Sequence, residues 1–104
     1  MPYRLAFTPE AQEQLAALYR YIAEHNAPEV AERYTSAIVS CCESLVILPH
    51  RGTRRDDVRP GLRITHHKKR TVIAFTVDEE QVSIVGIFYG GRNYESALQI
   101  EPDE

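Results

Sequence analysis

Two helical stripes separated by a very short break constrain the fold of this chain more than any other feature of its sequence. Apolar residues recur at spacings of three and four along residues 9–24 and again along residues 28–48. Pro9 and Pro28 suit the first turn of each helix, and Pro49 ends the second. Because so few residues separate the stripes, the two helices should fold back on each other as an antiparallel hairpin. The apolar positions are Ala11, Leu15, Leu18, Tyr19 and Ile22, and then Val30, Tyr34, Ala37, Ile38, Cys41, Leu45 and Leu48.

Segments with strand character flank the helical hairpin on both sides. Residues 3–7 alternate in polarity, with a period of two that indicates a short strand. After an irregular loop over residues 49–61, three further strand segments follow at residues 62–67, 71–77 and 82–89. Their connections are short, so these three strands should form an antiparallel meander. The middle strand is almost entirely apolar or β-branched, which is typical of a strand covered on both faces.

The order of elements is therefore β-α-α-β-β-β, which predicts an α+β fold. The helical hairpin should pack on one face of a small, mainly antiparallel sheet. A length of 104 residues, 43% of them hydrophobic and 26% charged, is typical of one globular domain. We therefore expect a single domain over residues 1–104, with its core at about residues 3–89 and a C-terminal segment at residues 90–104. In that segment, Asn93 should cap a short helical turn that ends near Leu98.

Several classes of protein are excluded or disfavoured by the composition. No apolar run reaches roughly 18 residues, and the first residues lack the apolar stretch of a signal peptide, so a cytoplasmic protein without a membrane span is expected. The adjacent Cys41 and Cys42 point about 100° apart on a helix and have no His at a ligand spacing beside them. We therefore expect neither a metal site nor a cofactor.

Charge is strongly segregated along the chain. Residues 49–70 carry eight Lys or Arg against two Asp, a local charge of +6, although the whole chain has a net charge of −3. Three of the four His fall in the same segment. A positive field this concentrated attracts an acidic protein segment or a phosphate backbone. The alternative interpretation is a solvated loop and hairpin, since strand edges often carry Lys.

Five short motifs occur along the chain in an order and spacing that together are more specific than any one motif. They are Phe7-Thr8-Pro9-Glu10-Ala11, Tyr21-Ile22-Ala23-Glu24-His25-Asn26-Ala27-Pro28-Glu29, Leu48-Pro49-His50-Arg51-Gly52, Pro60-Gly61-Leu62-Arg63 and Ile87-Phe88-Tyr89-Gly90-Gly91-Arg92-Asn93-Tyr94. Over roughly residues 3–98, this series resembles the RelE/ParE superfamily of bacterial toxins, and it is closer to ParE than to RelE.

The resemblance implies the toxin component of a type II toxin–antitoxin system. ParE-like members inhibit DNA gyrase, whereas RelE-like members cut messenger RNA on the ribosome. The partners implied are a cognate ParD-like antitoxin, which wraps around the toxin, and gyrase as the target. Operator DNA is reached only indirectly, through the antitoxin. We therefore expect an inhibitory binding protein rather than an enzyme; the alternatives are a ribosome-dependent endoribonuclease and a weakened toxin that only binds its antitoxin.

Nuclease chemistry would place specific demands on the residues of the sheet. Cleavage of RNA through its 2′-hydroxyl needs a base, an acid and cations around one phosphate. The candidates for these roles are Arg63, His67, Arg70 and Arg92. The adjacent His66 and His67 point to opposite faces of a strand and cannot chelate one ion together. If the face that carries Leu62 and Ile64 packs on the helices, only His67 can join Arg63 on the open face.

A binding role predicts a larger set of residues near one end of the sheet. In a hairpin whose turn lies at residues 78–81, position 70 should lie opposite position 89, so that Arg70 and Arg92 can meet near Tyr89. The resemblance aligns Arg92 with the arginine of the last ParE-like motif; the alternative is a salt bridge from Arg92 to a nearby carboxylate, Asp56, Asp57 or Glu95. The residues expected to bind target or antitoxin are Arg63, Lys68, Lys69, Arg70, Tyr89, Arg92 and Tyr94.

Overall fold

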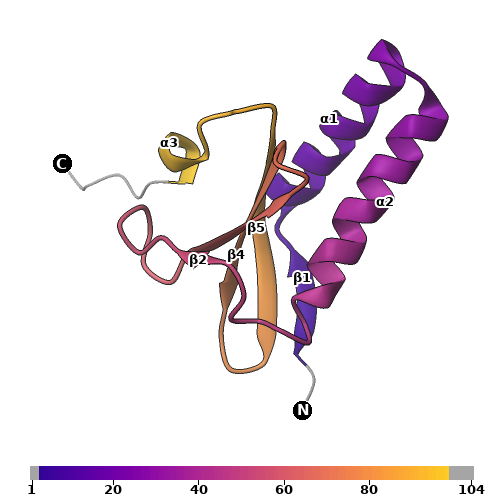
Figure 1. Ribbon diagram of the computed structural model, residues 1–104. Coiled ribbons are helices and arrows are strands. Elements are labelled where there is room, and N and C mark those ends of the chain that lie inside the picture. Colours follow the sequence, from indigo (N-terminus) through magenta and orange to yellow (C-terminus); the bar gives the residue numbers. More distant parts are fainter. Residues whose placement is uncertain (1–2, 99–104) are drawn as a thin grey trace.

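The fold is a two-layer arrangement of a mixed five-stranded sheet with a helical hairpin across one face (Figure 1). The computed structural model describes residues 3–98. The elements are β1 (Arg4–Phe7), α1 (Pro9–His25), α2 (Pro28–Ser44), β2 (Thr53–Arg54), β3 (Arg63–His67), β4 (Thr71–Val77), β5 (Gln81–Tyr89) and α3 (Tyr94–Leu98). The strand order is β1-β5-β4-β3-β2, with β1 parallel to β5 and every other pair antiparallel. The predicted α+β class and element order are confirmed, and the last six residues of the predicted C-terminal segment lie outside the described residues.

The two long helices begin where the sequence predicts. Thr8 caps α1, because its hydroxyl accepts a hydrogen bond of 3.1 Å from the backbone N–H of Ala11. Pro9 and Pro28 occupy the first turns of α1 and α2. Within residues 3–98, no helix has both the length and the apolar character that crossing a bilayer requires. The apolar stripes of the hairpin pack against the sheet, in a core that joins Leu18, Ile22 and Ile38 to strand residues such as Phe75.

The end of α2 differs from the prediction. The helix ends at Ser44 rather than near Leu48, because the next residues change to tighter turns in which Leu45 bonds back only three residues, to the carbonyl of Cys42. This tightening rotates the chain, so that Leu45 is buried while Leu48 is 53% exposed. The apolar stripe of α2 is also displaced by one residue here, since Cys42 rather than Cys41 is fully buried in the core. Burial raises the pKa of the Cys42 thiol to about 12.

Each face of β4 is buried, as predicted, but the two faces have different covers. Ile73 and Phe75 pack against the helical hairpin, whereas Ala74 faces the other way. Since Ile64 pairs with Ala74, it also faces away from the helices, in a second cluster with Phe88. The condition under which His67 would join Arg63 on an open face, that the Leu62/Ile64 face packs on the helices, is therefore not met. That face is covered by the β2–β3 loop and α3, through Val58 and Leu98.

A β-bulge in β5 changes the register of the last hairpin. Phe75 pairs with Ile84 but Ala74 pairs with Gly86, so Val85 is an extra residue on β5. The bulge shifts the pairing by one, and Thr71 rather than position 70 lies opposite Tyr89. The predicted register was therefore off by one residue at this end of the sheet. Gly86 cannot be replaced without adjustment, because a Cβ there would lie 2.4 Å from the ring of Phe88.

Two turns determine how β3 enters and leaves the sheet. Before it, Leu62 donates to the carbonyl of Arg59 across a turn in which Gly61 has a φ of +80°, as the Pro-Gly pair predicts. After it, three residues, 68–70, connect β3 to β4, and the first two have positive φ, Lys68 at 56° and Lys69 at 68°. Both lysines therefore adopt the left-handed conformation that usually favours Gly or Asn.

Candidate functional site

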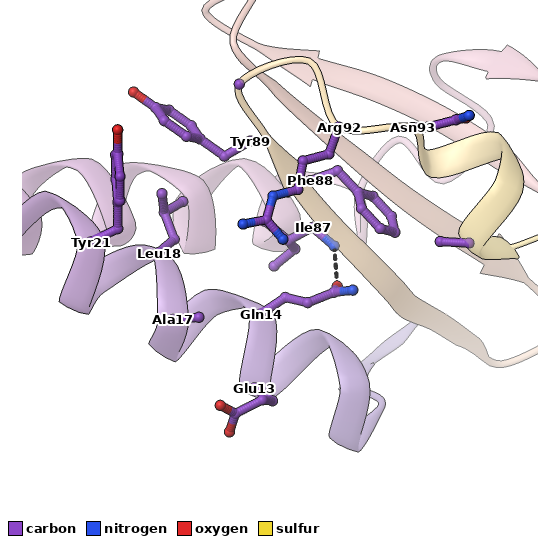
Figure 2. Close-up of a pocket in the computed structure, with 12 residues that line it drawn as sticks. Glu13, Gln14, Ala17, Leu18, Tyr21, Ile87, Phe88, Tyr89, Arg92 and Asn93 are labelled. Atoms are coloured by element: carbon purple, nitrogen blue, oxygen red, sulfur yellow. Dashed lines mark hydrogen bonds between the residues drawn. The ribbon is translucent and has the colours of Figure 1, made fainter.

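A groove of about 710 Å³ lies between α1, the last residues of β5 and the segment that follows β5. Figure 2 shows this groove, with Tyr21 and Tyr89 at one end and the Arg92 side chain extending back toward α1. Its apolar lining comes from both layers of the fold, through residues of α1, β5 and α3: Ala17, Leu18, Ile87, Phe88 and Ala97. Two charged side chains also line the groove, Arg92 and Glu13, and the Glu13 carboxylate pairs with Arg20 at 3.1 Å. An apolar floor beside the Arg92 guanidinium is suited to an apolar segment that carries a carboxylate.

The groove borders an open edge of β5. The pairing of β1 with β5 stops at Ile84, whose carbonyl accepts from the backbone of Thr8. Beyond it, the backbone N–H of Ile87 donates a hydrogen bond of 2.7 Å to Oε1 of Gln14 on α1. The Gln14 side chain thus takes the place of a neighbouring strand. Unpaired strand edges of this kind are where an incoming peptide can add a strand.

Arg92 is exposed in this groove, and it lacks the ion pair that was its alternative explanation. Of the salt bridges recorded over residues 3–98, none includes Arg92. The carboxylate of Asp56 lies 2.9 Å from Arg54, and those of Asp57 and Glu95 lie 2.9 Å and 2.6 Å from Arg55. The three expected partners of Arg92 are therefore bound to other arginines.

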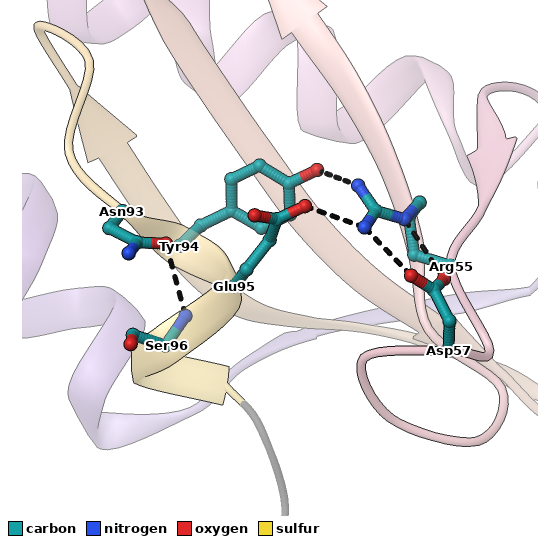
Figure 3. A network of polar contacts seen from close by, with 6 residues as sticks. All are labelled: Arg55, Asp57, Asn93, Tyr94, Glu95 and Ser96. Atoms are coloured by element: carbon teal, nitrogen blue, oxygen red, sulfur yellow. Dashed lines mark hydrogen bonds and ion pairs between the residues drawn. The ribbon is translucent and has the colours of Figure 1, made fainter.

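Arg55 is the centre of a network that sequence reasoning missed (Figure 3). Its guanidinium donates to the carboxylates of Asp57 and Glu95 and to the hydroxyl of Tyr94, and it lies 5.7 Å from the centre of the Tyr94 ring. The hydrogen bonds to Asp57 and then to Glu95 raise the pKa of Arg55. The bond from Arg55 also lowers the pKa of Asp57. The network joins α3 to the β2–β3 loop. With eight basic residues in this segment, no local pattern singles out Arg55.

Tyr94 therefore has a packing role in the structure rather than a place beside Arg92 in the groove. Its ring packs against Phe88, 6.3 Å between centroids, and its hydroxyl is bound by Arg55. Asn93 caps α3 as predicted, because its side chain accepts from the backbone of Ser96 at 3.1 Å.

An aromatic cluster lies at the end of the sheet beside the β3–β4 turn. The ring of Tyr34 on α2 lies 5.2 Å from His67 and 5.8 Å from Tyr89, and Tyr89 lies 6.1 Å from Tyr21. The hydroxyl groups of Tyr34 and the fully buried Thr71 are 2.8 Å apart. Burial, followed by the charge of Lys68, lowers the pKa of His67. Its Nε2 is buried without a hydrogen-bond partner in the described part of the chain.

The nuclease candidates do not all meet at one point. Arg63 and His67 share a face of β3, as predicted, but it is the face toward the helices. Arg63 donates to the carbonyl of His50 at 2.8 Å and is four residues from His67, roughly 13 Å along a strand. Arg70 and Arg92 lie at the His67 end, because the carbonyl of Arg70 accepts from Gly90.

The remaining predicted binding residues also lie at this end of the sheet. Lys68, Lys69 and Arg70 are exposed, and Tyr89 contributes to both the groove and the aromatic cluster. Among residues 3–98, no group of three His, Cys, Asp or Glu is arranged to hold a metal ion. The structure thus brings Lys68, Lys69, Arg70, Tyr89 and Arg92 to one end, and leaves Arg63 and Tyr94 apart from them.

Comparison with known proteins identifies relatives of this chain. The family model described as the ParE toxin of the type II toxin–antitoxin system, parDE, matches residues 5–94. Toxin ParE3 of Caulobacter vibrioides is 30% identical over 95 residues, which cover 91% of this chain and 94% of that protein. A solved structure, the chromosomal ParDE TA system from P. aeruginosa, has the same fold, with a TM-score of 0.74 at 24% identity, over 85% of this chain and 96% of the matched one.

Proposed function

The chain belongs to the ParE toxin family of type II toxin–antitoxin systems, and on that basis we propose that it inhibits DNA gyrase in the cytoplasm and is neutralised by a cognate ParD-like antitoxin. The observation that carries the proposal is the groove beside β5, in which an apolar floor, an open strand edge and the cation of Arg92 lie together. An inhibitor that acts by binding needs such a surface and no general base.

The antitoxin is proposed to occupy the groove and the positive segment next to it. An extended segment could add to the edge of β5 in place of Gln14, with apolar side chains over Leu18 and Phe88. Its carboxylates would pair with cations of residues 49–70, which carry a charge of +6. Charged contacts at the rim mainly raise the rate of association, whereas buried apolar contacts hold the complex together.

Arg92 is proposed to recognise the target. Arg and Tyr are the residues most often found at binding hot spots, and Arg92 shares its groove with Tyr21, which is 50% exposed. A guanidinium without a carboxylate partner in the described structure retains its full capacity to bind a partner's acceptor groups. Tyr94 would support this role only indirectly, by holding α3 in place.

Two assays run side by side test the proposal against its alternatives. The purified toxin is added to gyrase in a DNA supercoiling assay and to a translation-coupled assay of messenger RNA cleavage, each with and without antitoxin. Inhibition of supercoiling that the antitoxin relieves supports the proposal. Cleavage of RNA without an effect on gyrase would favour the RelE-like endoribonuclease, and antitoxin binding with neither activity would indicate a toxin that has lost its potency.

Replacement of the histidines separates binding from catalysis. His66→Ala and His67→Ala should leave growth inhibition nearly unchanged if no general base is needed. An endoribonuclease that loses its base should lose activity on the order of 10²-fold or more. A loss of that size at either position, with the fold intact by circular dichroism, would contradict the gyrase proposal.

A further inference from the structure

The β3–β4 turn has an unfavourable sequence for its conformation. Lys68 and Lys69 have positive φ, at 56° and 68°, as the two central residues of a tight turn in which the backbone N–H of Arg70 donates to the carbonyl of His67. Positive φ at both central positions favours Asn-Gly. Strained backbone conformations of this kind cluster at functional sites. The side chains at these two positions are adjacent cations at the tip of a hairpin.

The charges at this turn are not neutralised within the described residues. Lys68, Lys69 and Arg70 are all exposed, and none of them forms a salt bridge among residues 3–98. Arg54 and Arg55, in the same basic segment, do pair with carboxylates. Three adjacent like charges repel one another, so this turn gains the most from a partner that carries several negative charges at regular spacing.

Aromatic rings lie directly beside the turn. Tyr34, His67 and Tyr89 form edge contacts at 5.2 Å and 5.8 Å, and Nε2 of His67 has no hydrogen-bond partner in the described structure. Rings beside a row of cations are the combination by which proteins bind single-stranded nucleic acid, through base stacking and phosphate contacts.

We propose that the β3–β4 turn binds single-stranded nucleic acid, with Lys68, Lys69 and Arg70 on its phosphates and the neighbouring rings beside a base. This contact is separate from the groove beside β5 and goes beyond the proposed function, which requires only protein partners. The turn should bind a nucleic acid in preference to an acidic peptide. The nucleic acid supplies regularly spaced phosphodiester charges together with bases that can stack on the rings.

The test is fluorescence anisotropy of labelled single-stranded oligothymidine and oligouridine, titrated with the purified toxin at several salt concentrations. Lys68→Gln with Lys69→Gln removes two cations from the turn. Arg4→Gln with Arg54→Gln is the control of equal charge change, since it removes two exposed cations, paired with Glu80 and Asp56, at the opposite end of the sheet. The turn variant should lower the slope of log K against log salt by about 1.4, or 0.7 for each lost phosphate contact, and the control should leave it unchanged.

A second variant removes the possibility that a folding defect explains the loss. Lys68→Asn with Lys69→Gly supplies the preferred residues of the turn, so thermal stability should rise while oligonucleotide binding falls. The proposal is overturned if the parent binds neither oligonucleotide at low salt, if the control pair weakens binding equally, or if the Asn-Gly variant binds as well as the parent. It is also overturned if a labelled poly-glutamate peptide binds the turn in preference to both oligonucleotides. Tighter binding of one oligonucleotide would identify DNA or RNA as the source of the phosphates.

Discussion

Oε1 of Gln14 accepts the hydrogen bond that the backbone N–H of Ile87 would otherwise offer to a neighbouring strand. Gln14→Ala should therefore destabilise the free toxin by about 1 kcal/mol, the usual contribution of one such bond. It should not weaken antitoxin binding, because the antitoxin is expected to replace Gln14 at this edge. Chemical denaturation and calorimetric titration measure the two effects. Glu24→Ala, at an exposed position of α1 whose side chain forms no hydrogen bond among the described residues, is the control, and a tenfold loss of antitoxin affinity in Gln14→Ala would contradict this use of the edge.

Arg92→Ala tests target recognition separately from stability. Because Arg92 is exposed and forms no salt bridge within the described residues, the substitution should change the free energy of unfolding by no more than about 0.5 kcal/mol. Growth inhibition should be lost, while antitoxin binding survives through its apolar contacts. Growth curves on induction, together with co-purification of the antitoxin, measure both. A fully toxic or an unfolded Arg92→Ala protein would exclude this role for Arg92.

The hydroxyl pair of Tyr34 and Thr71 predicts a coupled effect on stability. Tyr34→Phe leaves the hydroxyl of Thr71, which is fully buried, without this partner and should cost about 1–3 kcal/mol. Adding Thr71→Val to Tyr34→Phe removes the hydroxyl that has lost its partner and should recover part of the lost stability. A double-mutant cycle by denaturant unfolding gives the coupling energy. Additive effects of the two substitutions would show that the hydroxyls do not act as a pair.

His67 predicts a dependence of stability on pH. Burial lowers the pKa of His67 below its ordinary value of 6.5, with a smaller effect from Lys68, while Tyr34 packs on the ring without adding a charge. The unfolded chain therefore binds the proton more readily, so His67 stabilises the fold above pH 6.5, and this stabilisation is lost as the pH falls through the lowered folded pKa. His67→Gln should flatten the decline in unfolding temperature between about pH 7 and pH 5. The exposed His66→Gln is the control, and an equal effect of both would count against this assignment.

Much of the fold is predictable because its elements have clear periods. The stripe that includes Leu18 and Ile22 indicates a helix, and the apolar run around Ile73 indicates a strand covered on both faces. The early end of α2 is not predictable in this way, because Leu45 and Leu48 both fit the apolar spacing and only the tighter turns separate them. The two-residue β2 is too short to show any period.

The candidate site is less predictable than the fold, because it depends on which side chains meet across the chain. The approach of Arg70 to the start of the segment that contains Arg92 follows from counting along a hairpin, and it is correct to within one residue. The sequence does not indicate that Asp57 and Glu95 bind Arg55 rather than another arginine. That contact depends on the position of α3 relative to a loop about 40 residues earlier. The contact of Gln14 with the open edge of β5 is likewise not predictable from the sequence, because a polar residue on a helix normally faces solvent.

The extra residue in β5 has a consequence for how this protein can change over time. Because Val85 is unpaired, Ile84 and Ile87 both face the helices although they are three positions apart, and Phe88 faces α3. A deletion of Val85 would bring Gly86 directly after Ile84 and keep every other pair of β4 and β5, whereas a deletion of a paired residue such as Ile87 would exchange the faces of the residues beyond it. Only the second change would disrupt the groove and the aromatic cluster together. The strand can therefore change its length at the bulge, but not at the paired positions that follow it, without losing both surfaces.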